Sequence, residues 1–438
     1  MLKFIYPIVY VLLVISPLML IFLTGPLTNH GVVYEMGKAF ALMGYIMLAL
    51  QFLLASRQKM IEKHYGLDMI FKYHKAMAIL AGMLILSHPI LLSLGLGNFD
   101  MLTSLNLPWY IWLGKAVFIV ILIQVLVSLF RKKFRIGFEK WRLSHNIFAG
   151  IILSGAFIHS MVTSHGDLQI GVLQYFWIGV FCAGLISYIN HKFIKPARLK
   201  KKAYTISAVK QETHNVWTLE MTPPKESSRF DYYPGQFHFI TLFRDSELPV
   251  EEHPFTISSS PTRAGVVTST IKQVGDFTST IGQTQKGDRV SIEAPFGRFS
   301  HVLHPDDDHD LIFIAGGVGI TPLMSMLRYM RDKRSYKNVL LLYANRTRAD
   351  IVFQEELNSI ISEEYPILKI VYILSQPDNN WSGEKGYLDN MKMSKYIADF
   401  SNKTFYLCCP PPMRKTVLSI LNERQVKEDQ IRVEIFSL

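Results

Sequence analysis

Residues 71–92 read FKYHKAMAILAGMLILSHPILL and residues 141–162 read WRLSHNIFAGIILSGAFIHSMV. Each apolar stretch contains two histidines 14 residues apart: His74 and His88 in the first, His145 and His159 in the second. Fourteen residues are close to four helical turns, so each pair lies on one helix face, roughly 21 Å apart along the axis. Two such helices side by side would form two levels, each with two histidines.

Ionisable residues inside membrane helices are costly and usually functional. A single such histidine is more often a core residue hydrogen-bonded to a carbonyl, but two pairs with equal spacing favour ligation. Imidazole suits iron, copper or zinc. Two pairs of imidazoles at two depths of a bilayer core of roughly 30 Å suit a pair of haems best. We therefore predict that the four histidines bind two haem groups.

Six apolar runs are long enough to cross a bilayer: residues 4–23, 36–55, 69–94, 109–130, 143–162 and 171–194. The first run opens with Met-Leu-Lys, as a signal peptide could. Pro7 and Pro17 interrupt it, however, and no clear cleavage site follows, so we predict that it is retained. The sequence thus predicts a six-helix transmembrane bundle.

Positive charge follows the second, fourth and sixth runs: Arg57, Lys59, Lys63, Arg131, Lys132, Lys133, Arg135, Lys192, Lys195, Arg198, Lys200, Lys201 and Lys202. The loops around Asn29, Asn98 and Gly166 carry almost no Lys or Arg. The positive-inside rule then predicts a multi-pass protein of the cytoplasmic membrane with both termini in the cytoplasm. The first histidine of each pair lies near the cytoplasmic side and the second near the external side.

The composition is compatible with this topology. The chain has 438 residues, is 49% hydrophobic and carries a formal charge of +11. No nucleic-acid motif is present, and the basic residues lie next to the spans, so the lipid bilayer is the predicted partner of the charge. The three cysteines, Cys182, Cys408 and Cys409, suggest no disulfide framework, which fits a reducing compartment for the second half.

The pattern changes at about residue 203. Short alternating runs, as in residues 204–209 and 216–221, predict an antiparallel β-barrel. After about residue 308, strands alternate with helical stretches, which predicts a parallel α/β domain. The predicted domains are residues 1–195 in the membrane, 196–202 as a basic linker, 203–307 as the barrel and 308–438 as the α/β domain.

A glycine turn lies in the α/β part. Residues 312–323 read IFIAGGVGITPL, a strand that enters a turn at Gly316, Gly317 and Gly319. We expect a helix to follow, with Thr321 as its N-cap and Pro322 at its first helical position. Such glycines let the backbone approach a phosphate, and a helix N-terminus favours its negative charge.

A second motif lies in the predicted barrel. Residues 253–259 read HPFTISS, and residues 234–237, PGQF, precede them. By its chemistry this is a strand with hydroxyl donors and an aromatic residue, which could hold a flat heteroaromatic ring or could simply be part of the barrel.

On these motifs the chain resembles the ferric reductase and NADPH oxidase superfamily of membrane flavocytochromes b, and most closely its short bacterial members. The resemblance covers nearly the whole chain. It implies a transmembrane haem domain with two haem b groups, followed by a ferredoxin-reductase-like module that combines a FAD-binding β-barrel with an NAD(P)H-binding α/β domain.

The resemblance also implies residue roles for the flavin. Thr256 would hydrogen-bond the flavin ring, His253 would lie by the FAD phosphates or ribityl chain, and the segment VGDFT at residues 274–278 would lie near the pyrophosphate. The implied flavin site comprises Pro234, Gly235, Gln236, His253, Pro254, Phe255, Thr256, Ser258, Ser259, Gly275 and Thr278.

For the nucleotide, residues 408–413, CCPPPM, resemble the family's Cys-Gly-Pro-Pro-x-Met motif. Cys409 stands where the family has glycine, which affects the site if that position needs a positive φ or close approach. The C-terminal Glu434-Ile435-Phe436 resembles a terminal Glu-x-Phe whose aromatic ring covers the flavin. The implied nucleotide site comprises Gly316, Gly317, Gly319, Thr321, Pro322, Cys409, Pro411 and Met413, with Cys408 and Phe436 at the reacting rings.

Two further arginines bear on nucleotide choice. Arg346 and Arg348 follow the predicted strand at residues 339–343, where the 2′-phosphate of NADPH would lie. They could equally be solvated loop residues, so the preference for NADPH over NADH is weak.

Taken with the resemblance, the sequence predicts an NAD(P)H oxidase or ferric-reductase-type enzyme. Electrons would pass from cytosolic NAD(P)H through FAD and two bis-histidine haems to an external acceptor, with O2 reduction to superoxide favoured. A ferric chelate as acceptor, or an electron-supply role for a membrane partner, is the alternative. A transporter with a nucleotide-sensing domain is a third hypothesis, but a transporter has no need for haem ligands.

Overall fold

The computed structural model describes residues 2–24, 31–163, 171–245, 247–305 and 307–435. The chain divides into two compact units, Met1–Lys195 and Pro196–Leu438. The first unit carries the paired histidines, and the second carries the glycine turn and the HPFTISS motif.

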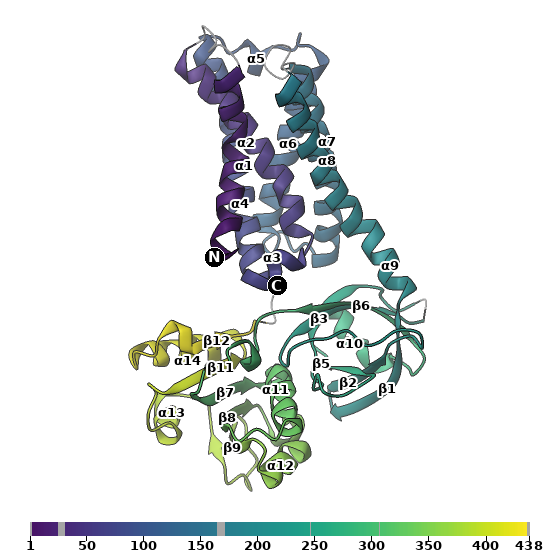
Figure 1. The fold of residues 1–438 in the computed structure, drawn as a ribbon, viewed down its shortest axis with the longest axis vertical. Helices are drawn as coiled ribbons and strands as arrows, with labels where there is room; N and C mark the ends of the chain where they lie inside the picture. The colour runs from purple at the N-terminus through teal and green to yellow at the C-terminus, as the bar shows by residue number, and fades with distance from the viewer. Residues whose placement is uncertain (1, 25–30, 164–170, 246, 306, 436–438) are drawn as a thin grey trace. The chain divides into compact units, whose positions relative to one another are not determined.

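The first unit is helical (Figure 1). Its helices are α1 (Leu2–Thr24), α2 (Val32–Ala55), α3 (Lys59–Tyr65), α4 (Leu67–Leu96), α5 (Asp100–Thr103), α6 (Trp109–Phe130), α7 (Phe138–Thr163) and α8 (Gly171–Ile189). In the described part of the chain, five helical runs are long and apolar enough to cross a membrane. The sixth expected span corresponds to α1, whose described apolar part, Phe4–Met19, is shorter.

Glycines allow the closest helix contacts in this unit, where α4 packs along α2 and α7 packs along α6. A Cβ on Gly44 of α2 would lie 2.6 Å from Ile85 of α4. Similarly, a Cβ on Gly155 of α7 would lie 2.6 Å from Val117 of α6. Small residues let helix backbones approach closely in a membrane, where packing rather than hydrophobic burial holds helices together.

The expected basic linker is helical. α8 continues through a π-helical turn, Asn190–Ile194, into α9, Lys195–Lys201. The change to β-structure follows at once, because β1 begins at Tyr204.

The second unit begins with an antiparallel sheet. Its six strands are in the order β4-β3-β6-β1-β2-β5, with bounds β1 Tyr204–Thr213, β2 Val216–Thr222, β3 Phe237–Phe243, β4 Glu252–Thr256, β5 Val267–Lys272 and β6 Arg289–Phe296. The edge strands β4 and β5 contact each other, and the Ser258 amide donates to the Thr268 carbonyl at 2.9 Å. The sheet therefore curls around the apolar core formed by residues such as Ile206, Leu219 and Ile240.

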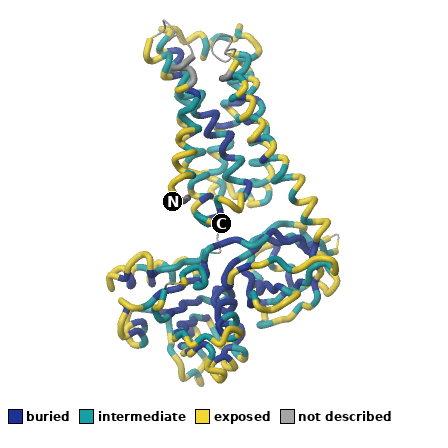
Figure 2. The backbone as a smooth tube through the Cα atoms, in the orientation of Figure 1, coloured by how far each residue is buried: buried dark blue, intermediate teal, exposed yellow. Residues whose placement is uncertain are grey.

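The α/β part has six strands, all parallel, in the order β10-β9-β8-β7-β11-β12. The strands are β7 Asp310–Gly316, β8 Asn338–Asn345, β9 Ile367–Leu374, β10 Glu384–Lys385, β11 Lys403–Cys408 and β12 Ile431–Val433. One face packs on α11 (Ile320–Asp332) and α12 (Gln354–Glu363), and the other on α13 (Asn390–Tyr396) and α14 (Pro411–Glu423). Figure 2 shows that buried residues concentrate in this sheet and in α11.

The strand order reverses at β7, since the chain first builds outward through β8, β9 and β10, then returns to β11 on the other side. In open α/β sheets, ligands bind at the carboxyl ends of the strands where the order reverses. The fold therefore places the expected nucleotide site between the ends of β7 and β11.

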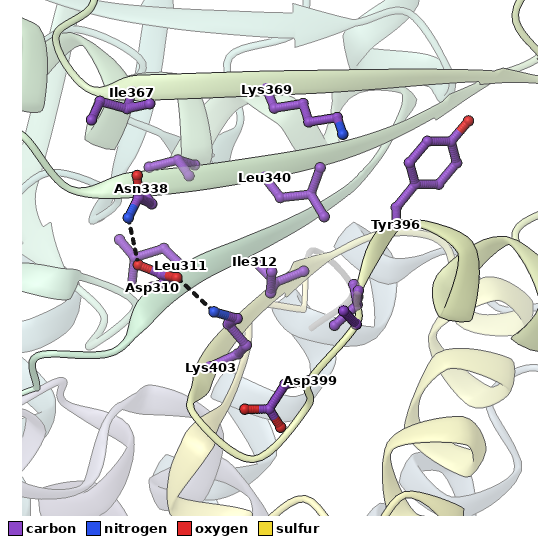
Figure 3. A pocket seen from close by; sticks show the side chains of 13 residues that line it. Asp310, Leu311, Ile312, Asn338, Leu340, Ile367, Lys369, Tyr396, Asp399 and Lys403 are labelled. Carbon is purple, nitrogen blue, oxygen red and sulfur yellow. Dashed lines mark hydrogen bonds and ion pairs between the residues drawn. The ribbon is translucent and has the colours of Figure 1, made fainter.

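A pocket of about 380 Å³ lies at the opposite edge of this sheet, at the amino ends of the strands (Figure 3). Asp310 at the start of β7 accepts hydrogen bonds there from Lys403 at 2.5 Å and from Asn338 at 2.9 Å. None of the motif residues lines this pocket.

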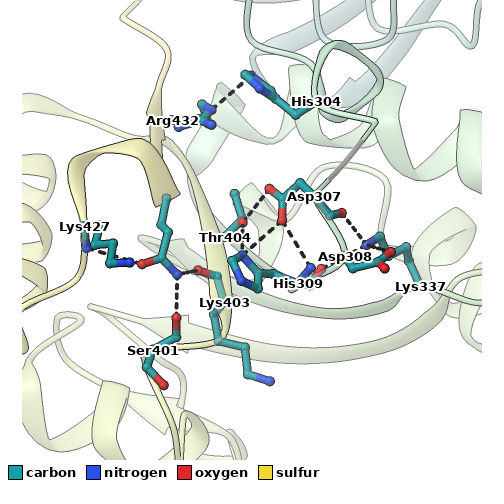
Figure 4. Close-up of polar contacts among 11 residues, drawn as sticks. His304, Asp307, Asp308, His309, Lys337, Ser401, Lys403, Thr404, Lys427 and Arg432 are labelled. Carbon is teal, nitrogen blue, oxygen red and sulfur yellow. Dashed lines mark hydrogen bonds and ion pairs between the residues drawn. The ribbon is translucent and has the colours of Figure 1, made fainter.

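The segment that joins the two sheets is fixed to the α/β part by polar contacts (Figure 4). Thr404 Oγ1 donates to Asp307 at 2.7 Å, and Lys337 Nζ donates to the Asp307 carbonyl at 2.7 Å. Arg432 Nε donates to His304 Nε2 at 3.1 Å.

Helix α11 bonds directly to the first sheet. Arg328 donates to the Ser258 carbonyl at 2.6 Å and to both carboxylate oxygens of Glu356 at 2.8 and 2.6 Å. Ser325 donates to the Ser259 carbonyl at 2.7 Å. The strand that carries the HPFTISS motif is thus fixed against the helix that follows the glycine turn.

Candidate functional site

The structure brings His74 of α4 and His145 of α7 together. Their ring centroids are 6.3 Å apart, with an angle of 59° between the ring planes. A metal-bound imidazole nitrogen lies about 2 Å from the metal and its ring centre about 3 Å, so two imidazoles on opposite sides of one metal have centroids roughly 6 Å apart. The observed separation therefore fits two imidazoles that would hold one iron between them.

The second histidine of each pair has a fixed tautomer. His88 Nδ1 lies 3.0 Å from the Gly37 carbonyl of α2, and His159 Nδ1 lies 2.8 Å from the Tyr110 carbonyl of α6. A carbonyl only accepts, so each Nδ1 carries the hydrogen and each Nε2 keeps its lone pair. Metal-bound histidines typically donate their other N–H in this way. Both rings thus keep Nε2 available to a metal at this level.

Contacts to the first pair differ. Gln124 Nε2 of α6 lies 2.5 Å from His145 Nδ1 and 3.1 Å from the His145 carbonyl. His74 Nδ1 makes no hydrogen bond within the described chain, although the Gln51 carbonyl of α2 lies near this ring. No sequence signal marks Gly37 or Tyr110, because each acts through its main chain. The only sign of Gln124 was its polarity in an apolar run.

A glycine also admits His159. A Cβ on Gly114 of α6 would lie 2.5 Å from His159 Cε1. Any larger residue there would push the imidazole away from its level, so this position restricts the ring as the carbonyl of Tyr110 does.

In the second unit, Thr256 is the best-supported of the predicted flavin residues. It ends β4, is 5% exposed, and its Oγ1 has no hydrogen-bond partner in the described part of the chain. A buried hydroxyl without a partner costs about 1–3 kcal/mol. A ligand that bonds to Thr256 would remove that cost.

His238 lies on β3 next to this strand and belongs to none of the predicted motifs. It is fully buried, its Nε2 lies 2.6 Å from Ser269 Oγ, and Ser269 Oγ donates to the Thr256 carbonyl at 3.1 Å. Burial lowers the pKa of His238 to about 3, so the ring is neutral. It supports the Thr256 backbone from inside the barrel.

His253 lies on the same strand as Thr256, with Pro254 and Phe255 between them. Its Nε2 lies 2.8 Å from Glu251, and its ring stacks on Phe277 with centroids 4.3 Å apart. Arg244, another residue outside the predicted motifs, lies 5.2 Å from the Phe277 ring and donates to Thr280 at 2.9 Å. The predicted pyrophosphate segment therefore has a cation beside it.

The segment at residues 274–278 is held in shape by one of its own side chains, that of Thr278. Thr278 Oγ1 accepts from the amides of Val274 and Gly275, at 3.0 and 2.9 Å, and donates to the Gly275 carbonyl at 3.2 Å. Thr278 therefore shapes the loop. Contacts from this segment to a ligand would come from its backbone and not from the Thr278 hydroxyl.

Other predicted flavin residues have structural partners. Gly235 has φ +91°, and a Cβ there would collide with the Phe299 carbonyl. The Gln236 side chain accepts from the Tyr233 amide and donates to the Gly297 carbonyl, both at 2.8 Å. The remaining residues hold the turn or the neighbouring strand and helix: Pro234, Ser258 and Ser259.

The two nucleotide motifs meet at the strand-order reversal. Gly316 ends β7 and Cys408 ends β11, and these strands are paired neighbours. A Cβ on Gly316 would collide with Pro410, and a Cβ on Gly319 would collide with the Cys408 carbonyl. Gly317 has φ +53°. The glycines are thus needed for the turn and for the close approach of residues 408–410.

One expectation at this turn is wrong. Thr321 is not the N-cap, and Pro322 is not the first helical residue, because α11 begins at Ile320 with Gly319 as its cap. Gly317–Gly319 form a 3₁₀ turn that leads directly into α11, and Thr321 Oγ1 donates to the Val318 carbonyl at 3.0 Å. The glycine turn itself makes helical hydrogen bonds, so the helix begins two residues nearer the N-terminus than expected.

Cys409 does not have a positive φ, so replacing the family glycine causes no backbone strain. Burial raises the pKa of the Cys409 thiol to about 11, and burial with nearby Glu434 raises the pKa of Cys408 well above its usual value. Both thiols are protonated at neutral pH. Pro411 begins α14, and Met413 packs on the core under it.

The remaining predicted nucleotide residues lie after β8 and at the C-terminus. Arg346 and Arg348 follow β8, are exposed, and Arg346 Nε donates to Gln376 at 2.7 Å. Glu434 continues from β12, where its amide donates to the Leu407 carbonyl at 2.9 Å. Phe436 lies outside the described residues.

Three family matches follow one another along the chain. Residues 40–156 match the ferric reductase like transmembrane component, residues 200–300 match a FAD-binding domain, and residues 313–419 match the oxidoreductase NAD-binding domain. The matches agree with the positions of the histidine helices, the antiparallel sheet and the parallel sheet.

Among curated proteins, the chain is 30% identical over 198 residues to the glycine betaine monooxygenase reductase subunit of Chromohalobacter salexigens, covering 44% of this chain and 52% of that protein. It is 24% identical over 246 residues to one subunit of the Na(+)-translocating NADH-quinone reductase of Yersinia pseudotuberculosis, covering 52% and 58%. The chain spans about half the length of these relatives.

Among solved structures, the flavohemoglobin of Malassezia yamatoensis with bound FAD and heme has a TM-score of 0.50 at 17% identity, covering 96% of this chain and 98% of that one. The FAD/NAD-binding domain of a Vibrio cholerae nitric oxide dioxygenase has a TM-score of 0.48 at 20% identity, covering 53% and 97%. The first of these likenesses concerns the fold alone.

The domain matches and the reductase relatives show an NAD(P)H-dependent oxidoreductase with sites for FAD and the nucleotide in its second half. The apolar helices show a multi-pass membrane protein. A ferric-reductase-like membrane domain followed by FAD-binding and NAD-binding domains gives this chain the architecture of the ferric reductase and NADPH oxidase-like flavocytochromes.

Proposed function

We propose that this enzyme moves electrons from cytosolic NAD(P)H through FAD and two bis-histidine haem b groups to an acceptor on the external face, with O2 reduced to superoxide. The observation that carries this proposal is the 6.3 Å separation of the His74 and His145 rings. An apolar bundle has no packing need for imidazoles at two levels, and their cost in a membrane is balanced when they bind metal.

The proposed orientation in the cytoplasmic membrane rests on charge. Figure 1 shows α3 and α5 at opposite ends of the helical unit. The α3 end carries Lys59 and Lys63, whereas α5 carries no basic residue. The positive-inside rule then puts the α3 end in the cytoplasm, and with six predicted spans both termini would lie on that side.

The chain's own residues have distinct tasks in this function. When bound, FAD accepts a hydride from NAD(P)H and releases single electrons, which haem iron can carry. Gly316 and Gly319 let residues 408–410 approach the glycine turn, where the nucleotide would bind, and the Thr256 hydroxyl orients the flavin. His74 with His145, and His88 with His159, would hold the irons through imidazole nitrogens, and the irons would then supply single-electron transfer without binding the acceptor.

A second candidate is favoured by the names of the curated relatives, which are reductase subunits of larger systems. This chain would then supply electrons to a membrane partner. A ferric chelate is the other candidate for a direct acceptor.

Steady-state turnover of the purified protein separates these candidates. We expect NAD(P)H oxidation in air with reduction of cytochrome c that superoxide dismutase suppresses. Dismutase-insensitive reduction of ferric citrate at a higher rate would instead identify a ferric reductase. Turnover with neither acceptor, in protein that contains flavin and haem, would contradict direct transfer and favour the electron-supply role.

Replacing His88 by Leu should remove one haem and leave roughly half the haem per protein, because the inner pair keeps both of its ligands. His159→Leu should do the same. Haem is measured as the pyridine haemochrome relative to protein. His64→Leu is the matched control, since His64 lies in the same unit but on α3, which carries none of the four ligands. Full haem occupancy in both ligand variants would refute the assignment.

The flavin extracted from the protein should be FAD rather than FMN, because a pyrophosphate segment at Gly275 accompanies Thr256. Thr256→Val removes the unpaired hydroxyl at nearly constant volume and should weaken FAD binding roughly 5- to 30-fold, about 1–2 kcal/mol. Thr256→Ser, which keeps the hydroxyl, is the control. Chromatography of the released flavin and fluorescence titration check both points. Stoichiometric FMN, or equal affinity in the Val and Ser variants, would contradict this assignment.

The exposed arginines after β8 should read the 2′-phosphate of NADPH. Arg346→Ala or Arg348→Ala should raise the KM for NADPH about tenfold and leave the KM for NADH nearly unchanged, as expected for the loss of one charge-assisted hydrogen bond. Arg334→Ala is a control that removes another basic residue from the same domain. Equal effects on both nucleotides in both variants would leave a general electrostatic role.

A further inference from the structure

The groups on neighbouring helices that lie near the four imidazoles have the same spacing along the chain as the histidines. Helix α2 brings the carbonyls of Gly37 and Gln51 to the two rings of α4, and α6 brings Tyr110 and Gln124 to the two rings of α7. Each pair of partners is 14 residues apart, as the histidines are. This match follows from the pairing of α2 with α4 and of α6 with α7.

Gln124 departs from this pattern. At the other three positions the group near the ring is a main-chain carbonyl, which no substitution removes. At Gln124 it is a side-chain amide, 2.5 Å from His145 Nδ1, and this is the one side-chain hydrogen bond that any of the four rings makes in the described part of the chain. The side chain is half-buried on the face of α6 that meets α7.

We propose that Gln124 is a positioning residue that fixes the tautomer of His145 and sets the reduction potential of the iron at the inner level. This inference rests on the proposed haem ligation. For Nε2 of His145 to bind iron, Nδ1 must carry the hydrogen and donate it. In the structure Gln124 Nε2 faces both Nδ1 and the His145 carbonyl. Half a turn of the amide gives up the contact to the carbonyl and presents Oε1 to Nδ1–H as an acceptor.

The electronic consequence has a defined sign. An acceptor on Nδ1–H makes the imidazole a stronger donor to the metal. A stronger donor stabilises ferric over ferrous iron and lowers the midpoint potential. Removing the acceptor should therefore raise the potential of this iron, and a carboxylate in its place should lower it. A residue that merely filled space would not produce shifts of opposite sign.

The test uses the full-length protein in detergent with haem bound. Potentiometric titration followed at the haem α-band should resolve two midpoints. We expect Gln124→Leu to raise one midpoint and Gln124→Glu to lower that same midpoint, with the other unchanged. Gln124→Leu should also weaken haem retention roughly tenfold.

Ser128→Ala is the matched control. Ser128 lies one turn further along α6 and accepts a hydrogen bond from Trp141 of α7 at 3.2 Å, so its loss removes a contact between the same helices without touching the Gln124 amide. The Trp141 ring packs on His145 with centroids 5.0 Å apart, so this variant also tests whether freeing the indole alone moves a midpoint. It should move neither midpoint.

Several results would overturn the inference. These are unchanged midpoints in both Gln124 variants, shifts of the same sign, or equal shifts of both midpoints. If Gln124→Leu retains no haem, retention in Gln124→Glu and Ser128→Ala supports the positioning role, whereas loss in all three overturns it. Wild-type protein that binds no haem would overturn the proposed function and this inference together, and is distinguished by the pyridine haemochrome before any titration.

Discussion

The membrane unit depends on one constraint: an imidazole in a bilayer has two ring nitrogens and no water to bond with. One nitrogen must donate a hydrogen, and the other must give its lone pair to a partner. At the His88 and His159 level, carbonyls of neighbouring helices take the hydrogen. The remaining nitrogen of each of these two rings would bind the proposed iron, so at this level the protein scaffold and the proposed cofactor would each satisfy half of a ring.

The second unit depends on a different constraint, which is the space between the ends of two neighbouring strands. The strand order reverses beside β7, and the ends of β7 and β11 approach so closely that Gly316 and Gly319 leave no room for a Cβ. The same sheet is fixed to the segment after β4 that completes the HPFTISS motif, through Arg328 and Ser325 of α11. The helix that follows the glycine turn therefore fixes the distance between the two cofactor sites of this unit.

Two features of the fold and the candidate site could be predicted from the sequence, because each depends on a pattern within one segment of the chain. The spacing of His74 and His88, and of His145 and His159, predicted two rings per helix face, and the Gly316–Gly319 run predicted a turn between strand and helix. Gly37 and Tyr110 could not be found in this way. Every residue has a carbonyl, so the sequence does not record which carbonyl a neighbouring helix will present. Thr321 was misplaced because Thr-Pro resembles a helix start, while the glycines before it already make 3₁₀ hydrogen bonds.

The protonated state of Cys408 and Cys409 has a consequence for the lifetime of the protein. Peroxide attacks the thiolate and not the thiol. Burial raises the pKa of Cys409 to about 11, so very little of it is thiolate at pH 7, and Cys408 is buried. Superoxide release, as proposed for this enzyme, would expose it to the peroxide that superoxide forms by dismutation. The end of β11, although it carries two adjacent sulfur atoms, would therefore be a poor target for oxidative damage.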